Sequence, residues 1–260
     1  TLCVIDPGPD STAHLDAILA AIGTANVSHI IVTHNHLDHS PLTKPLSEAT
    51  GAKIYAFGDH HAGRSAIMKE LSSQGLAGGG EGIDSRFKPD VILQDGEIIT
   101  TNDWTLTALH TPGHIGNHLS LIWGDAVFSG DHVMGWASSL VSPPDGDLTD
   151  FMTSCAKLHA LNARILYPAH GAPITAPNAR IDWLTNHRLT REAQVLKALL
   201  RGPKTTAKIT SEIYTDIDPA LLAAAERNVF AHLVDLHQRA KITATPTLST
   251  DAKFNPSEEN

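Results

Sequence analysis

Cysteine is scarce in this chain, and long apolar runs are absent from it. Two cysteines, Cys3 and Cys155, stand among 260 residues. They are too few for a disulfide framework and lack the spacing of metal ligands. No stretch approaches the roughly eighteen apolar residues of a membrane span, and no signal peptide is recognisable. We expect a soluble, cytoplasmic protein with two free thiols and no membrane contact. Because TLCVIDPGPD reads as the middle or end of a strand, we also expect a segment before Thr1.

Positive charge is also in short supply. The chain carries 19 lysines and arginines against 28 acidic residues, a net charge of −9. Residues 1–179 hold 8 basic and 18 acidic residues, whereas residues 180–260 hold 11 and 10. An acidic surface repels a long polyanion, except where bound divalent cations reverse the local charge. The change in charge predicts two units, residues 1–178 and residues 179–260.

Histidine, by contrast, is abundant, with 16 residues. Three histidines and an aspartate lie close together in IVTHNHLDHS (31–40), at His34, His36, Asp38 and His39. They follow an apolar run, so they stand where a buried strand leaves its sheet. An unpaired carboxylate buried there is costly, and adjacent imidazoles suppress one another's charging, whereas a divalent cation relieves both problems. The pattern therefore predicts a metal site rather than a histidine-rich surface loop.

Short apolar runs alternate with polar loops and helical stretches, which predicts an α/β or α+β layered domain. Strands are predicted at 29–34, 52–57, 104–113, 118–123, 126–131 and 163–170, and helices at 14–23 and 147–161. The glycine-rich residues 75–90 read as an exposed loop. Beyond residue 180 we expect helices at 181–201, 206–214 and 218–239, a short strand at 241–246 and a frayed tail at 251–260.

Three further candidate ligands each follow directly after a predicted strand. His114 stands in HTPGH, Asp131 in FSGD and His170 in YPAHG. We expect their strands to end on one rim of the sheet, together with the strand before His34. The whole set holds five histidines and two aspartates, enough for two metals that share a carboxylate and keep positions open for solvent.

These motifs resemble those of the metallo-β-lactamase superfamily. Residues 34–39 match its H-x-H-x-D-H signature, and TPGH, SGD and PAHG match its later ligand motifs in the same order. The resemblance covers residues 1 to about 175 and implies an αββα sandwich with the metals at one edge of the paired sheets. It implies a first metal held by His34, His36 and His114. It implies a second metal held by Asp38, His39 and His170, with Asp131 bridging the two.

Two more residues are candidates for a supporting role at this site. Asp6 in DPG (6–8) matches an early superfamily motif in which the aspartate lies near the ligands without binding metal. It either orients an imidazole or serves as a turn residue at a strand end. His118, four residues after His114, either contacts substrate or fills space beneath the ligand loop.

The predicted chemistry is hydrolysis of an ester-like bond. Two adjacent divalent ions lower the pKa of a shared water, so that a metal-bridging hydroxide is available at neutral pH. Asp38 is the predicted catalytic residue, because it is placed to orient that hydroxide or to pass a proton to the leaving group. Neither cysteine lies in a ligand motif, which disfavours a thiol nucleophile. Nitrogen and oxygen ligands suit two zinc ions, and the carboxylates also admit iron or manganese.

The second unit bears on the substrate. Residues 186–214 and 221–242 resemble the C-terminal winged-helix-like domain of the β-lactamase-like protein 2 group, whose animal members cleave single-stranded RNA. Its basic residues between 188 and 208 are Arg188, Arg191, Lys197, Arg201, Lys204 and Lys208. They form either a phosphate-binding strip or a solvated helix face balanced by acids elsewhere. No aromatic residues interleave them as in a base-stacking platform.

We therefore expect a small ester, thioester or lactam-type substrate, with a single-strand-specific endoribonuclease as the alternative. A second alternative is a regulator that binds DNA and is stabilised by its metals. It is disfavoured because structural zinc sites are closed and usually rich in cysteine. A homodimer is compatible with the apolar face of residues 219–236.

Overall fold

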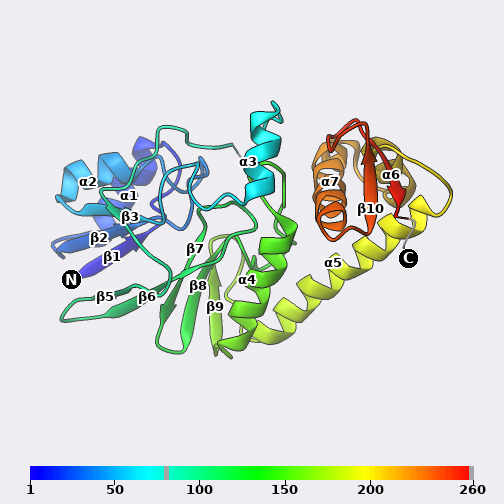
Figure 1. The fold of residues 1–260 in the computed structure, drawn as a ribbon. Coiled ribbons are helices and arrows are strands. Elements are labelled where there is room, and N and C mark those ends of the chain that lie inside the picture. The colour runs from blue at the N-terminus through cyan, green and yellow to red at the C-terminus, as the bar shows by residue number, and fades with distance from the viewer. Residues whose placement is uncertain (79–81, 258–260) are drawn as a thin grey trace.

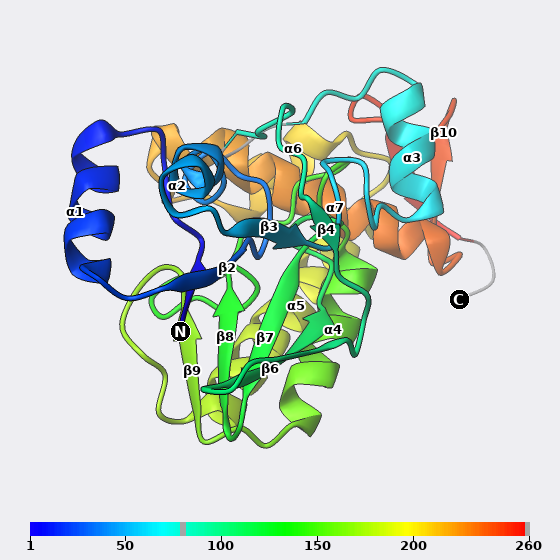
Figure 2. The ribbon, with the colours of Figure 1, turned by 90° about the vertical axis from the view of Figure 1, so that its left-hand side faces the viewer.

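The computed structural model describes residues 1–78 and 82–257. Two β-sheets lie face to face with helices on their outer sides, and further helices and a hairpin extend from one end (Figure 1, Figure 2). Part of the predicted glycine-rich loop, residues 79–81, and the end of the predicted frayed tail, residues 258–260, lie outside the described residues. Within the described part of the chain, no helix has the length and apolar character needed to cross a bilayer.

The first sheet is parallel throughout. Its strands, in spatial order, are β1 (Leu2–Ile5), β2 (Val27–Ile31), β3 (Lys53–Ala56) and β4 (Val91–Ile92). The helices that follow the first three strands are α1 (Thr12–Ile22), α2 (Thr43–Thr50) and α3 (Ala66–Ser73). Because parallel strands all point the same way, the residues that follow β1 and β2 emerge at the same edge.

The second sheet is mostly antiparallel. Its strands, in spatial order, are β5 (Ile98–Thr100), β6 (Thr105–His110), β7 (Leu119–Trp123), β8 (Ala126–Gly130) and β9 (Ile165–Pro168). Two antiparallel steps separate β6 from β8, and β9 runs parallel to β8. The carboxyl ends of β6, β8 and β9 therefore share one edge, and these are the strands that precede His114, Asp131 and His170.

Within the sandwich, apolar clusters fill the spaces between the sheets and between the sheets and their helices. Ile31 of the first sheet packs in one cluster with Leu106 and Leu121 of the second, so the two sheets face each other. Residues of α1 cover Val27 and Ile30 on the outside of the first sheet. On the outside of the second sheet lie α4 (Leu148–Ala160) and α5 (Pro177–Leu199), packed against β8 and β9. The αββα sandwich that the motif resemblance implied is confirmed.

The C-terminal elements form a winged-helix unit. Helices α6 (Thr206–Ile213) and α7 (Leu222–Gln238), with a 3₁₀ turn at Pro219–Leu221, precede a hairpin of β10 (Ile242–Thr245) and β11 (Lys253–Pro256). The prediction of a frayed tail at 251–260 is wrong for its middle part, because residues 253–256 pair with β10 and Phe254 is fully buried. Helix α5 contributes to both the sandwich core and the winged-helix core, and the predicted boundary between residues 178 and 179 falls within its first turn (Figure 1).

Several short elements escaped prediction, among them α2, α3, β4 and β5. Their runs of two to eight residues are too short to carry a clear periodic signal. The predicted exposed loop at 75–90 is partly packed, since Phe87 is buried and Ile83 forms a bridge with His36. That bridge brings the described part of the loop to the edge where the candidate ligands lie.

Candidate metal centre

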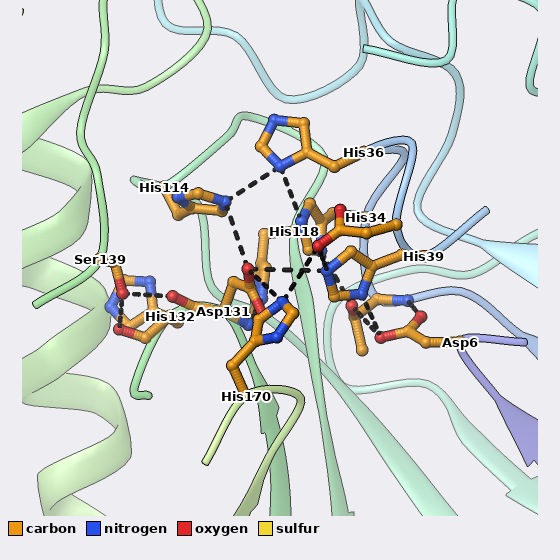
Figure 3. A network of polar contacts seen from close by, with 12 residues as sticks. Asp6, His34, His36, His39, His114, His118, Asp131, His132, Ser139 and His170 are labelled. Carbon is orange, nitrogen blue, oxygen red and sulfur yellow. Dashed lines mark hydrogen bonds and ion pairs between the residues drawn. The ribbon is translucent and has the colours of Figure 1, made fainter. Parts of the chain in front are cut away.

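Five histidines and two aspartates converge at the shared edge of the two sheets (Figure 3). His34, His36, Asp38 and His39 come from the turns after β2, while His114, Asp131 and His170 follow β6, β8 and β9. Residues separated by up to 136 positions in the sequence thus meet because their strands end on the same side. All seven predicted ligands are part of this one cluster.

Three imidazoles form a closely spaced, buried group. Nδ1 of His36 lies 2.9 Å from Nε2 of His34 and 3.1 Å from Nε2 of His114. All three rings are buried in the protein. Three ring nitrogens that point at one another across such distances describe one face of a tetrahedral metal site.

A second group lies beside the first and is more open. Nε2 of His170 is 3.1 Å and Nε2 of His39 is 3.5 Å from Oδ2 of Asp38. The side chains of Asp38 and His170 are 36% and 39% exposed, so this side of the cluster faces solvent. Oδ2 of Asp131 lies between the two groups, 3.5 Å from His170 Nε2, 3.6 Å from His39 Nε2 and 3.9 Å from His114 Nε2.

Several buried polar atoms of this cluster have no hydrogen-bond partner among the described residues. They are Oδ1 of Asp38, Oδ1 of Asp131 and Nε2 of His39. Leaving such atoms unpaired is expensive, and buried carboxylates next to imidazole nitrogens are the ligands that divalent cations take up. The residues present therefore fit divalent metal ions.

The surroundings of His34, His36 and Asp131 shift their pKa values toward the protonation states that bind metal. Burial and the neighbouring imidazoles lower the pKa of His34 well below its ordinary value and that of His36 to about 3. Burial opposes the charged form of Asp131, but contact with His39 and the other imidazoles outweighs it and lowers the pKa of Asp131. At neutral pH His34 and His36 are thus neutral and Asp131 is charged, which are the forms that bind metal.

His39 differs from His34 and His36 in its charge. Burial disfavours its charged form, but the carboxylates of Asp6, Asp131 and Asp38 raise the pKa of His39 to about 12. Without a metal its ring therefore carries the positive charge that balances these acids. A cation at the same place supplies that charge instead and takes the place of the Nε2 proton.

Partners outside the cluster decide which ring nitrogen of His34, His39 and His114 faces inward. Nδ1 of His114 donates to the carbonyl of Leu140 at 2.7 Å, and Nδ1 of His39 donates to Asp6 at 3.0 Å. Nδ1 of His34 lies 3.0 Å from the hydroxyl of Thr33, which itself donates to Asp6 at 2.6 Å. These bonds direct Nε2 of His34, His39 and His114 at the candidate metal positions. No sequence motif pointed to Thr33 or Leu140.

Asp6 thus orients ligands rather than only turning the chain. Its two carboxylate oxygens accept from the backbone and hydroxyl of Thr33 and from His39, and its φ of 48° aims the side chain at both. We expect Asp6→Ala to weaken divalent metal binding by about 10–100-fold, the usual effect of losing a partner that orients a ligand. Competition with a chromophoric chelator measures this, with Asp10→Ala, an exposed carboxylate in the same turn, as the control. Equal metal affinity in both variants would remove Asp6 from this role.

His118 lies beneath the ligand loop and does not reach the substrate side. It is fully buried, its Nε2 accepts from the backbone N–H of Asp131 at 3.1 Å, and its Nδ1 donates to the hydroxyl of Thr111 at 2.9 Å. Gly130 has no room for a side chain, because a Cβ there would lie 2.5 Å from Nε2 of His118. His118 therefore supports the turn that presents Asp131, and the predicted alternative of substrate contact does not fit its burial.

Two cavities flank the cluster. One of about 470 Å³ touches Asp38, His39 and His170 and has apolar walls that include Ile5, Phe128, Tyr167 and Pro168. The other, of about 330 Å³, touches His36 and is lined by polar groups that include the Arg64–Asp145 ion pair. The cluster is thus accessible from an apolar side and a polar side.

Comparison with known proteins identifies the family. A model described as the metallo-beta-lactamase superfamily matches residues 2–170, and one described as the beta-lactamase associated winged helix domain matches residues 205–247. The chain therefore belongs to the metallo-beta-lactamase superfamily and carries the associated winged-helix domain.

Within that superfamily, the chain is similar to proteins named "Beta-lactamase-like protein 2 homolog". The Caenorhabditis elegans protein is 29% identical over 87% of this chain and 71% of its own length. The Drosophila melanogaster protein is 27% identical over 96% and 82%. The predicted resemblance to this group is confirmed.

Other relatives and structures are more distant or shorter in coverage. An "Atrochrysone carboxyl ACP thioesterase" of Aspergillus fumigatus is 31% identical over 71% of this chain, but the chain spans only about half (51%) of that protein. A beta-lactamase domain protein from Burkholderia ambifaria superposes with a TM-score of 0.79 at 20% identity, covering 98% of this chain and 82% of that one. A likeness at this identity shows the fold alone.

Proposed function

We propose that this protein is a dinuclear metal-dependent hydrolase of small esters or thioesters. The convergence of seven ligand side chains, with buried carboxylate and imidazole atoms left unpartnered, carries this proposal. Two divalent ions held there would supply a hydroxide at neutral pH and polarise the bond that it attacks. The superfamily and the thioesterase-named relatives support a hydrolase in general.

The roles of the ligands follow from the two groups that the side chains form. His34, His36 and His114 would hold the first ion, Asp38, His39 and His170 the second, and Asp131 would bridge them. Asp38 has one oxygen toward His170 and stands on the open side of the cluster. It can therefore orient the nucleophile or carry a proton to the leaving group. Zinc suits this nitrogen and oxygen ligand set, and iron or manganese are the alternatives.

A covalent thiol mechanism has no support. Burial raises the pKa of both thiols, Cys3 and Cys155, to about 12, so neither forms a thiolate at neutral pH. Cys3 forms part of the wall of the apolar cavity beside the candidate metal centre. That wall, with Phe128 and Tyr167, suits the acyl part of a substrate.

The basic residues of the second unit support a small substrate over RNA. Arg188 is buried in the protein, and Lys204 and Lys208 both pair with Glu212. Three of the six basic residues that could form a phosphate-binding strip are therefore buried or already paired with a carboxylate. A DNA-binding regulator is the less favoured alternative, because the metal cluster is open to solvent on the side of Asp38 and His170.

A single sample tests the proposal. Metal content is measured beside turnover of a chromogenic ester, an acyl thioester, a cephalosporin and a single-stranded RNA, each with and without chelator. We expect about two metals per chain and chelator-sensitive hydrolysis of the thioester or ester. Cleavage confined to RNA would replace the small-molecule assignment, and turnover that is indifferent to chelator would contradict the metal mechanism itself.

A further inference from the structure

One segment of the chain, residues 131–141, touches three of the seven ligands. It begins with Asp131 itself. The backbone N–H of Gly135 donates to the carbonyl of His170 at 2.9 Å, and the carbonyl of Leu140 accepts from Nδ1 of His114 at 2.7 Å. Any shift of this ligand-contacting segment would move Asp131 and disturb His114 and His170 together.

A serine near the end of the segment bonds to the carbonyls at its start. The hydroxyl of Ser139 donates to the carbonyl of Asp131 and lies 3.1 Å from the carbonyl of His132 (Figure 3). This bond ties the end of the segment to the residue that lies between the two metal groups. Ser139 is fully buried, so water does not compete for these carbonyls.

Side chains from the two long C-terminal helices hold the segment from its other side. Arg180 on α5 donates to the carbonyls of Met134 at 3.1 Å and Ala137 at 2.6 Å. Arg188, two turns further along α5, donates to the carbonyl of Ser139 and, at 2.9 Å, to Oδ1 of Asn228 on α7. That same Oδ1 accepts from the backbone N–H of Val141 at 3.2 Å.

Arg188 is an unusual residue for a purely structural role. It is only 3% exposed, and although burial lowers its pKa to about 10, it remains charged at neutral pH. Among the residues that the structure describes, no carboxylate forms an ion pair with it. Its guanidinium has the carbonyl of Ser139, the amide of Asn228 and the ring of Phe151, 5.0 Å away, around it. A buried cation with only neutral acceptors is a poor source of stability.

We infer that the winged-helix unit and its long helix α5 position the metal ligands, and that Arg188 is the principal positioning residue. Through Ser139 it holds Asp131, and through the same segment it fixes the partners of His114 and His170. This inference rests on the proposed metal centre, and it gives the second unit a role in metal binding whatever the substrate is.

The test compares two arginines of the same helix. Arg188→Met removes the contacts to the segment, whereas Arg191→Met is the control, because Arg191 lies over Tyr214 and bonds Gln194 without touching residues 131–141. Zinc affinity is measured by chelator competition, and ligand geometry is recorded from the visible absorption of the Co²⁺-loaded protein. We expect Arg188→Met to bind zinc about 10–100-fold more weakly and to give an altered Co²⁺ spectrum, with the control unchanged.

Further variants separate positioning from folding. Arg188→Lys keeps a donor for the carbonyl of Ser139 and should recover part of the affinity. If Arg188→Met does not fold, Arg180→Met carries the same comparison, since it removes two other bonds to the segment. A lower Tm with unchanged zinc affinity and Co²⁺ spectrum would overturn the inference. Absence of metal binding by the unaltered protein would instead overturn the proposed function.

Discussion

Replacing Asp38 by alanine is expected to lower kcat by about 10³-fold or more while the protein stays folded. Loss of a positioned acid or base alone accounts for roughly 10²–10⁴-fold, and this substitution also removes a side chain that the proposed function assigns to the second ion. The side chain of Asp38 is 36% exposed and its Oδ1 has no partner among the described residues, so the fold depends little on it. Steady-state turnover of the best substrate from the panel, with circular dichroism of the same sample, measures both effects.

A matched control for this experiment is Asp16→Ala. Asp16 is an exposed residue of α1 on the outside of the first sheet, and its loss should leave kcat within about twofold, as for most surface substitutions. A regulator that only binds DNA would keep its binding in both variants and show no turnover in either. Equal turnover of Asp38→Ala and Asp16→Ala would show that the carboxylate of Asp38 takes no part in the reaction.

Removing the metals is expected to abolish turnover and to lower Tm by roughly 10 °C. A cation present at about a thousand times its Kd stabilises the native state by about 4 kcal/mol. For a chain of this size each kcal/mol corresponds to about 2–4 °C in Tm. The physical reason is the cluster itself, in which buried oxygens of Asp38 and Asp131 lack partners until a cation reaches them. Thermal unfolding with chelator, and again after zinc is restored, measures the shift.

Two histidine variants show whether the change in Tm arises from metal binding at this cluster. His34→Ala removes a buried nitrogen of the three-histidine group and should lose most of the zinc-induced rise in Tm. His61→Ala removes an exposed ring outside the cluster and should keep it. A zinc-induced rise of equal size in both variants would mean that the metal binds elsewhere.

The sequence motifs predicted the candidate ligand residues of the metal centre more completely than they predicted the helices and strands around it. Ligand motifs are short and local, so His34 to His39 could be recognised without knowing their surroundings. The partners of these ligands lie far away in the sequence. The DPG motif pointed to Asp6, which bonds His39, but no local pattern signals a contact such as that of Leu140 with His114. The strand β11 was missed for a related reason, because KFNP is too short and polar to read as a strand until β10 and a buried site for Phe254 exist.

The clearest case is Arg188. In the sequence it stands in a run of basic residues and reads as part of a charged helix face. In the structure it is buried and donates to the carbonyl of Ser139, because the turn of α5 that carries it faces residues 131–141. Helical spacing predicts which residues share a face, but only the packing of α5 on the sandwich decides which face is buried.

The sequence by itself determined the candidate ligand residues, their order along the chain and hence the superfamily, because the chemistry of a metal ligand belongs to the side chain. Tertiary structure alone decided which ring nitrogens face inward, that Asp131 lies between the two groups and that His118 is enclosed beneath it. The physical reason is the distance along the chain between the interacting residues. Ligand identity is a property of single residues, whereas orientation arises from hydrogen bonds between strands and helices that only folding brings together.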